Sequence, residues 1–190
     1  MIKRPFLVIN PKNYFSQAEL YEMADIADPL VDEYGITLIL TGPFTELAAL
    51  KQRTTNLLIA AQHVDYVPGG VGMGRISPRD LKEIGVDVAV LNHAENPLHF
   101  SAIVEIVKEC NQLGMGTIVC CDSVMEARAI ALLNPTVILC EPTELIGTGQ
   151  TSDLSYVQEA NTMIRETNPE VLIEHAAGVN GLTPAQSAFH

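Results

Sequence analysis

The chain has 190 residues, of which 47% are hydrophobic and 18% charged, and its 11 basic and 23 acidic residues leave a net charge of −12. This length fits one domain with a full core, so we expect residues 1–190 to form a single domain. The charge disfavours nucleic acid and anionic membranes as partners, and without a long apolar run or a signal peptide the expected location is the cytoplasm.

Short β-rich runs alternate with amphipathic helical stretches along the whole chain. The pattern predicts strands at 5–9, 36–40, 57–61, 87–92, 116–121, 136–140 and 171–175. It predicts helices at 17–33, 44–52, 78–84, 97–113, 123–133 and 153–167. Repeated βα units with short connections predict a parallel sheet with right-handed crossovers, and strands that are apolar on both faces fit a sheet covered by helices.

Several helices carry recognisable start and stop signals. The capping-box pattern occurs at Ser16 with Glu19 and at Ser123 with Glu126, and in each pair we expect both side chains to bond backbone amides. Proline at the first helical position predicts helix starts at Pro78 and at Pro97. Glycines that fit helix ends are Gly35, Gly85 and Gly114.

Polar residues follow three of the predicted strands. Asn10 and Lys12 come after the first strand, His93 and Glu95 after the fourth, and Glu141 after the sixth, ahead of a glycine-punctuated loop. The carboxyl ends of parallel strands meet at one edge of a sheet, where ligands bind. The sequence therefore predicts a base, an imidazole and a cation around one small anion, which is a site for proton transfer.

The cysteines and the remaining histidines are not spaced as metal ligands. No CxxC spacing and no nearby histidine pair occurs, so buried free thiols are favoured over a metal site or a disulfide framework. The cysteines are Cys110, Cys120, Cys121 and Cys140. The histidines interpreted as structural or surface residues are His63, His99, His175 and His190.

Four motifs occur in register along the chain. The first two are Asn10-Pro-Lys12 and the run Ala60-Ala-Gln-His63, which is followed by the glycine-rich loop 69–74 and Ile76-Ser-Pro78. The other two are Asn92-His-Ala-Glu95 and Cys140-Glu-Pro142 with Ile146-Gly-Thr-Gly149. Together they resemble the motifs of the triosephosphate isomerase family, and their form is closest to the compact branch common in archaea. The resemblance implies a (β/α)8 barrel of which seven βα units are readable here.

The resemblance also implies an activity and a role for each site residue. The enzyme would interconvert dihydroxyacetone phosphate and glyceraldehyde 3-phosphate, in glycolysis and gluconeogenesis, without a cofactor or a metal. Glu141 would be the base, His93 the electrophile and Lys12 the electrostatic contact to substrate, with Asn10 and Glu95 in support of that lysine. Backbone amides near Gly147 and Gly178 would hold the phosphate.

Two further features follow from the resemblance. Residues 142–149 would form a mobile lid that closes over the site. The loop 69–74 would protrude into a neighbouring subunit, so the implied partner is a second copy of this chain in a homodimer or homotetramer.

The sequence departs from the family pattern in three places. Ala94 stands where the family has serine, and Ala176-Ala-Gly178 stands where a glycine-rich turn is usual. Residues 176–190 contain a helix start at Thr183-Pro184 and no eighth strand. A chain that ends at His190 is therefore expected to be weak as an isomerase and prone to associate through an open sheet edge.

Two other functions stay open on the sequence alone. One is a catalytically silent barrel remnant that binds a phosphometabolite or a partner subunit. The other is a related sugar-phosphate isomerase or epimerase, because a fold by itself does not determine the substrate.

Overall fold

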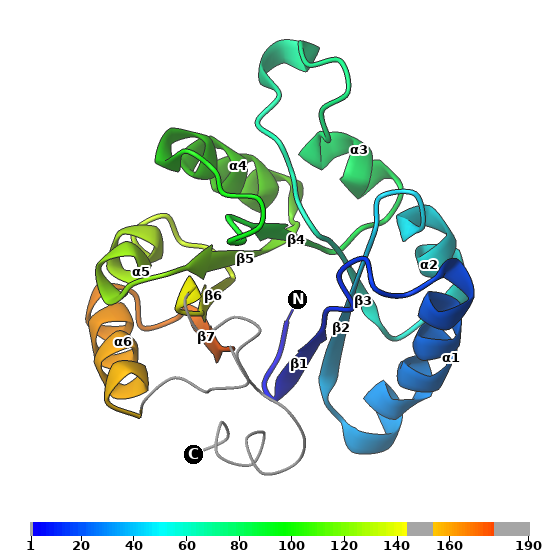
Figure 1. The fold of residues 1–190 in the computed structure, drawn as a ribbon, viewed down its shortest axis with the longest axis horizontal. Coiled ribbons are helices and arrows are strands. Elements are labelled where there is room, and N and C mark those ends of the chain that lie inside the picture. Colours follow the sequence, from blue (N-terminus) through cyan, green and yellow to red (C-terminus); the bar gives the residue numbers. More distant parts are fainter. Residues whose placement is uncertain (1, 144–153, 177–190) are drawn as a thin grey trace. The chain divides into compact units, whose positions relative to one another are not determined.

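The computed structural model describes residues 2–143 and 154–176, and over them parallel strands alternate with helices along the chain (Figure 1). The chain contains two compact units. The first comprises Met1–Leu91 and His99–Thr117, and the second Asn92–Leu98 and Ile118–His190.

The first unit contains four parallel strands that pair in chain order. They are β1 (Phe6–Ile9), β2 (Thr37–Gly42), β3 (Leu58–Ala61) and β4 (Val88–Leu91). The helices of this unit are α1 (Gln17–Tyr34), α2 (Leu47–Arg53), the 3-10 turn η1 (Pro68–Gly70), α3 (Pro78–Glu83) and α4 (Phe100–Leu113). Helices α1 and α2 lie along the same side of strands β1 to β3 (Figure 1), so these strands are covered by helices as predicted.

The second unit contains strands β5, β6 and β7 with helices α5 and α6. Strand β5 (Gly116–Cys121) begins in the first unit, where the Gly116 amide donates to the Asp87 carbonyl, and β6 (Val137–Cys140) and β7 (Leu172–His175) follow in parallel. Helices α5 (Val124–Ala131) and α6 (Leu154–Thr167) lie side by side along these strands (Figure 1).

The cores of both units are built from the apolar positions that the sequence patterns indicated. All four residues of β4 are buried, and so is the predicted apolar face of α4, which is formed by Ile103, Ile106, Val107 and Cys110. The four cysteines are buried free thiols, as predicted. In the described residues seven parallel strands, of which β1 to β6 are each followed by a helix, confirm the predicted barrel-type repeat. The prediction that an eighth strand is missing concerns residues 177–190, outside the described part.

Most predicted helix signals are confirmed, and two are wrong. Ser16 and Glu19 form the full capping box, and Gly35 and Gly114 end their helices in the left-handed conformation. The helix predicted from Pro97 begins instead at Phe100, because the first amide bonded to the start of α4 is that of Ala102, which donates to the carbonyl of His99. The Ser123 box is only half formed, because the Glu126 carboxylate bonds elsewhere.

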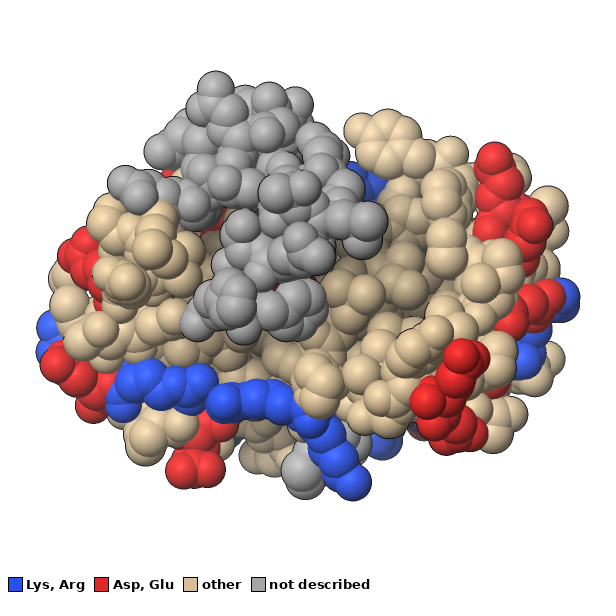
Figure 2. Space-filling model, turned by 90° about the horizontal axis from the view of Figure 1, so that it is seen from below, with Lys and Arg blue, Asp and Glu red and all other residues tan. Residues whose placement is uncertain are grey.

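Two surface properties bear on possible partners. Within residues 2–143 and 154–176, no helix is both long and apolar enough to span a membrane. On the face drawn in Figure 2, acidic side chains stand in several separate places rather than in one patch.

One carboxylate fixes the entry to β3. Asp28, inside α1, accepts hydrogen bonds from the backbone amides of three successive residues, Thr55, Asn56 and Leu57, at 2.8–3.1 Å. An ionised acceptor strengthens such bonds. Asp28 therefore holds the turn after α2 against α1 and sets where β3 starts.

We predict that Asp28→Ala lowers the free energy of unfolding by about 2–3 kcal/mol, because it leaves three backbone amides without their acceptor. Urea denaturation measures the change as a shift in midpoint at constant slope. Asp32→Ala is the matched control, since Asp32 is an exposed carboxylate of the same helix, and it should change stability by no more than about 0.5 kcal/mol. Equal effects of the two variants would contradict the role of Asp28.

Candidate active site

The polar residues after β1 are held by each other and by side chains of the first unit. Asn10 Oδ1 accepts hydrogen bonds from Thr41 Oγ1 at 2.7 Å and from the Lys12 amide at 3.0 Å. Lys12 has a φ of 49°, and its carbonyl accepts from Gln62 Nε2 at 2.8 Å. Asn10 therefore supports Lys12 through the lysine backbone, and Gln62 is a second support that the sequence did not indicate.

The turn after β4 carries His93 and Glu95 in the second unit. The Glu95 amide donates to His93 Nδ1 at 3.1 Å, and the Asn96 amide donates to the His93 carbonyl at 2.8 Å. A neutral imidazole has one donor and one acceptor nitrogen. Because Nδ1 accepts here, a neutral His93 carries its proton on Nε2, which is then free to donate to a carbonyl oxygen.

The segment that follows the histidine differs from the sequence prediction. The sequence predicted a helix beginning at Pro97, four residues after His93, whereas residues 97–99 are not helical and α4 begins at Phe100. The local partner of the ring is the Glu95 amide, two residues away. A tight turn therefore orients the imidazole within its own segment.

Glu141 lies directly after β6, as predicted, and lines a pocket of about 280 Å³ in the second unit. Its amide donates to the Cys121 carbonyl at 3.1 Å, which continues the pairing of β5 with β6 by one residue. The other lining residues are Asn92, Ala94, Pro97, Cys120, Cys121, Asp122, Glu126 and Thr143. Since Asn92 and Ala94 flank His93 in the chain, the candidate base and the turn that bears the imidazole meet at the same pocket.

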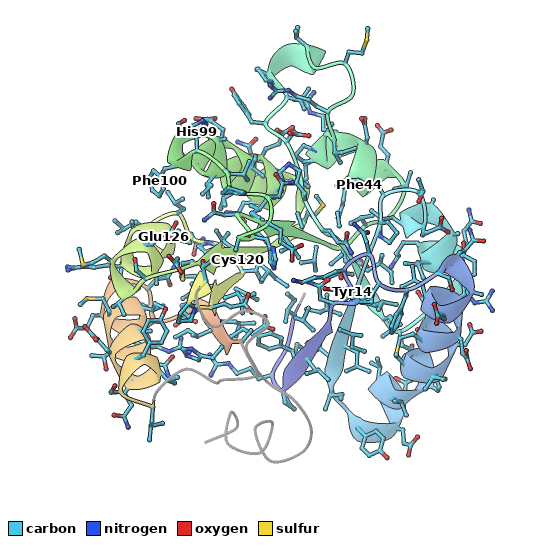
Figure 3. All side chains as sticks on the ribbon, viewed as in Figure 1. Tyr14, Phe44, His99, Phe100, Cys120 and Glu126 are labelled. Atoms are coloured by element: carbon cyan, nitrogen blue, oxygen red, sulfur yellow. The ribbon has the colours of Figure 1, made fainter. Side chains whose placement is uncertain are left out.

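Three polar residues of this pocket were not recognised as site residues from the sequence. Asn92 has a φ of 58°, and its side chain donates to the Cys120 carbonyl and to Glu126. Figure 3 labels Cys120 in β5 and Glu126 near the start of α5, on the side of that helix that faces the strands. Asp122 accepts from the Thr143 amide. The only sequence signal for this cluster is an asparagine directly before the histidine, because asparagine is one of the few residue types that adopt the left-handed conformation.

The thiols around the pocket are poor nucleophiles. Burial raises the pKa of Cys120, and a hydrogen bond to Cys140, with the two sulfur atoms 3.7 Å apart, raises that of Cys121. The thiolate is the reactive form of cysteine. These side chains therefore act as small apolar packing groups at the base of the pocket.

Strand β7 contributes a buried carboxyl group that the sequence did not single out. Glu174 Oε2 is buried without a hydrogen-bond partner in the described structure, and burial, with a smaller effect of Glu141, raises the pKa of Glu174 to about 7. The next residue, His175, bonds Asn161 in α6 through Nε2, as expected of a structural histidine. Because successive strand residues point to opposite faces, Glu174 points away from α6.

The remaining predicted site residues have different outcomes. Asn10 and Lys12 belong to the first unit, and His93, Glu95 and Glu141 to the second, so each group is characterised within its own unit. Gly147, Gly178 and the predicted lid beyond Thr143 lie outside the described residues. In the part of the chain that is described, no three His, Cys, Asp or Glu side chains gather as metal ligands.

Parallel βα repeats with a carboxylate and an imidazole at strand ends define the class of β/α-barrel enzymes. The family model described as "Triosephosphate isomerase" matches residues 5–181. Curated relatives with that name include one from Methanocaldococcus jannaschii, 31% identical over 92% of this chain and 81% of its own length. One from Methanobacterium bryantii is 27% identical over 93% and 80%, and one from Sulfurisphaera tokodaii is 34% identical over 78% and 66%. The chain therefore belongs to the triosephosphate isomerase family.

The tautomer of His93 is directly measurable. At a pH where the ring is neutral, we predict that Nε2 carries the proton and Nδ1 does not, because Nδ1 accepts from the Glu95 amide. Nitrogen-15 NMR of the imidazole distinguishes the two tautomers, and His93→Gln assigns the signal. A proton found on Nδ1 would contradict the hydrogen bond from Glu95.

The buried carboxyl of Glu174 should make stability depend on pH. Its folded-state pKa of about 7 lies above the ordinary value of 4.5, so its contribution to stability is complete below pH 4.5 and is lost as the pH rises through 7. Between pH 5 and 8 the wild type should lose about 2–3 kcal/mol relative to Glu174→Gln. Urea denaturation at both pH values measures this loss. Glu170→Gln, at an exposed position, is the control and should follow the wild type, whereas parallel pH profiles for wild type and Glu174→Gln would disprove the assignment.

Proposed function

We propose that this chain interconverts dihydroxyacetone phosphate and glyceraldehyde 3-phosphate by moving one proton between adjacent carbons through an enediolate. Glu141 is the base, His93 polarises the carbonyl oxygen, and Lys12 contacts the anionic substrate. The observation that carries the proposal is the meeting of Glu141 and the His93 turn at one pocket, with the histidine Nδ1 occupied by a backbone amide. Membership of the triosephosphate isomerase family supports the substrate class.

The proposed reaction accounts for every proton and electron pair that moves. The Glu141 carboxylate takes a proton from the carbon next to the carbonyl, and the bond electrons move onto the carbonyl oxygen. His93 Nε2–H donates a hydrogen bond to that oxygen, which stabilises the negative charge as it develops. For the carbonyl to move, the proton of the hydroxyl on the first carbon must pass to the former carbonyl oxygen, and His93 at that oxygen is the group proposed to carry it. Glu141, now protonated, returns its proton to the carbon that bore the original carbonyl, so the enzyme ends unchanged and needs no external acid, base or redox partner.

The surroundings of Glu141 favour its role as a base. Carboxylates become more basic when water is excluded and when another negative charge is near. The buried carboxyl of Glu174 interacts electrostatically with Glu141, and a substrate that fills the pocket removes water from it. Local positive charge must then attract the substrate to a chain of net charge −12, and Lys12 is the residue proposed for this.

The same proposal includes a location, a pathway and a partner. We place the enzyme in the cytoplasm, in glycolysis and gluconeogenesis, as a homodimer or homotetramer. The loop 69–74 supports the self-association, because Val71 and Met73 expose apolar side chains there. Asp65 holds the two ends of this loop together, because its amide donates to the Ile76 carbonyl and its carboxylate accepts from the Ile76 amide.

We predict that Glu141→Gln lowers kcat by about 10²–10⁴-fold while the protein remains folded, because the change removes basicity and little volume. An isomerase assay coupled to a dehydrogenase measures the rate, and circular dichroism checks the fold. Glu170→Gln, an exposed carboxylate of the same unit, is the matched control and should keep full activity. If Glu141→Gln retains more than about a third of wild-type kcat, Glu141 is not the base.

The wild-type assay separates the proposal from its alternatives. Turnover of triose phosphates supports the isomerase, binding of phosphometabolites without turnover supports a silent remnant, and preferential turnover of a larger sugar phosphate supports a related isomerase or epimerase.

A further inference from the structure

A hydrogen-bonded cluster beside the pocket is not used by the proposed reaction. Its first member is Asn92, whose Nδ2 donates to the Cys120 carbonyl at 3.0 Å and to Glu126 Oε1 at 3.2 Å, and whose Oδ1 accepts from the Leu98 amide at 3.0 Å. Asn92 thereby closes the whole turn 92–98, which contains His93, and ties it to β5. Asn92 has a φ of 58°, in the left-handed region. Asparagine is one of the few residues other than glycine that adopt this conformation, and it is less flexible than glycine.

The second member is Glu126, at the start of α5. One carboxylate oxygen accepts from Asn92 Nδ2, and the other accepts from the Asp122 amide at 2.8 Å. An ordinary capping box would direct this carboxylate to the amide of Ser123. Glu126 instead joins the turn that carries His93 to the end of β5.

The third member, Asp122, extends the cluster to the candidate base. Its Oδ1 accepts from the Thr143 amide at 2.6 Å, two residues beyond Glu141. On the other side of Glu141, its own amide is bonded to the Cys121 carbonyl. The amides of Glu141 and Thr143 are therefore both held by residues 121–122, one by the Cys121 carbonyl and the other by the Asp122 carboxylate.

We propose that Asn92 and Glu126 are positioning residues for catalysis. They hold the turn that carries His93 and the segment that carries Glu141 at a fixed distance from each other. This inference rests on the proposed function. The cluster joins segments that are 21 to 34 residues apart in the chain, and its members Asn92, Asp122, Glu126 and Thr143 all line the pocket. A displacement of about 1 Å between reacting groups lowers the rate by about 100-fold, so such anchors act on kcat.

The polarity of the Asn92–Glu126 bond allows a sharp test by exchange of donor and acceptor. In Asn92→Asp two carboxylates face each other, and in Glu126→Gln the new amide donor faces the donor of Asn92. When both changes are combined, the glutamine can donate to the aspartate while its oxygen still accepts from the Asp122 amide. The double variant therefore restores the bond between residues 92 and 126 with reversed polarity, whereas the bond to the Cys120 carbonyl stays lost, as it is in Asn92→Asp alone, so the recovery of kcat is partial.

We expect each single variant to lower kcat by about 10–100-fold with KM changed by less than about threefold, and the double variant to regain at least about fivefold over the worse single variant. Amide hydrogen exchange at Leu98, Asp122 and Thr143 should rise in the single variants and fall again in the double variant. The kcat values are compared under conditions in which every variant is fully folded. A loss of folding stability alone would then not lower kcat in the single variants or restore it in the double variant. If one single variant does not fold, the other and the double variant still decide the outcome.

Two matched controls exclude general effects of charge and backbone conformation. Asn134 is another left-handed asparagine, with a φ of 57°, and Glu159 is an exposed carboxylate of α6. Asn134→Asp and Glu159→Gln make the same chemical changes outside the pocket and should keep wild-type kcat.

The outcomes separate this inference from the proposed function. Two results would overturn the positioning role while an active wild type leaves the proposed isomerase intact. One is that the single variants keep kcat within about twofold of wild type. The other is that the double variant is as slow as the product of the two single losses. A wild type that turns over no triose phosphate, assayed beside a functional isomerase, overturns the proposed function and the positioning role with it.

Discussion

Parallel pairing in register is the constraint on which the pocket depends. In the second unit Cys121 lies opposite Cys140, and Cys140 lies opposite His175, so β5, β6 and β7 end at the same level. The residues that follow, Asp122, Glu141 and Ala176, consequently emerge at one edge. A shift of one residue in any strand would reverse the faces of its side chains and disperse this group.

The pocket then has to accommodate several carboxyl groups in a small volume, and the structure does so by different means. Glu126 accepts two hydrogen bonds, which fix the position of its carboxylate. Glu174 Oε2 has no such donor among the described residues, and its raised pKa keeps Glu174 partly protonated near neutral pH. Glu141 lines the pocket and interacts electrostatically with Glu174. Hydrogen bonding for Glu126 and burial for Glu174 are thus two different environments for the same type of side chain.

The orientation of the His93 imidazole and the anchoring of its turn depend on separate contacts. The Glu95 amide determines which nitrogen of a neutral His93 carries the proton, through a contact within the turn. Asn92 determines where the turn lies relative to β5, through contacts outside it. Both contacts come from residues next to or near His93 in the chain, so the motif around the histidine contains more of the candidate site than His93 itself.

The sequence by itself determined the elements and the identity of the chemical groups. Apolar periodicity predicted every described strand to within a few residues, and the position of Glu141 after β6 followed from the run Val137–Cys140. Local bonds of the Ser16 capping box were predictable because both partners lie within four residues. Tertiary structure decided the rest. The Glu126 carboxylate bonds the Asn92 side chain and the Asp122 amide instead of the Ser123 amide, and burial removes water from Glu174. Such choices depend on segments about 30 residues apart that only the paired strands bring within reach, and no local pattern encodes them.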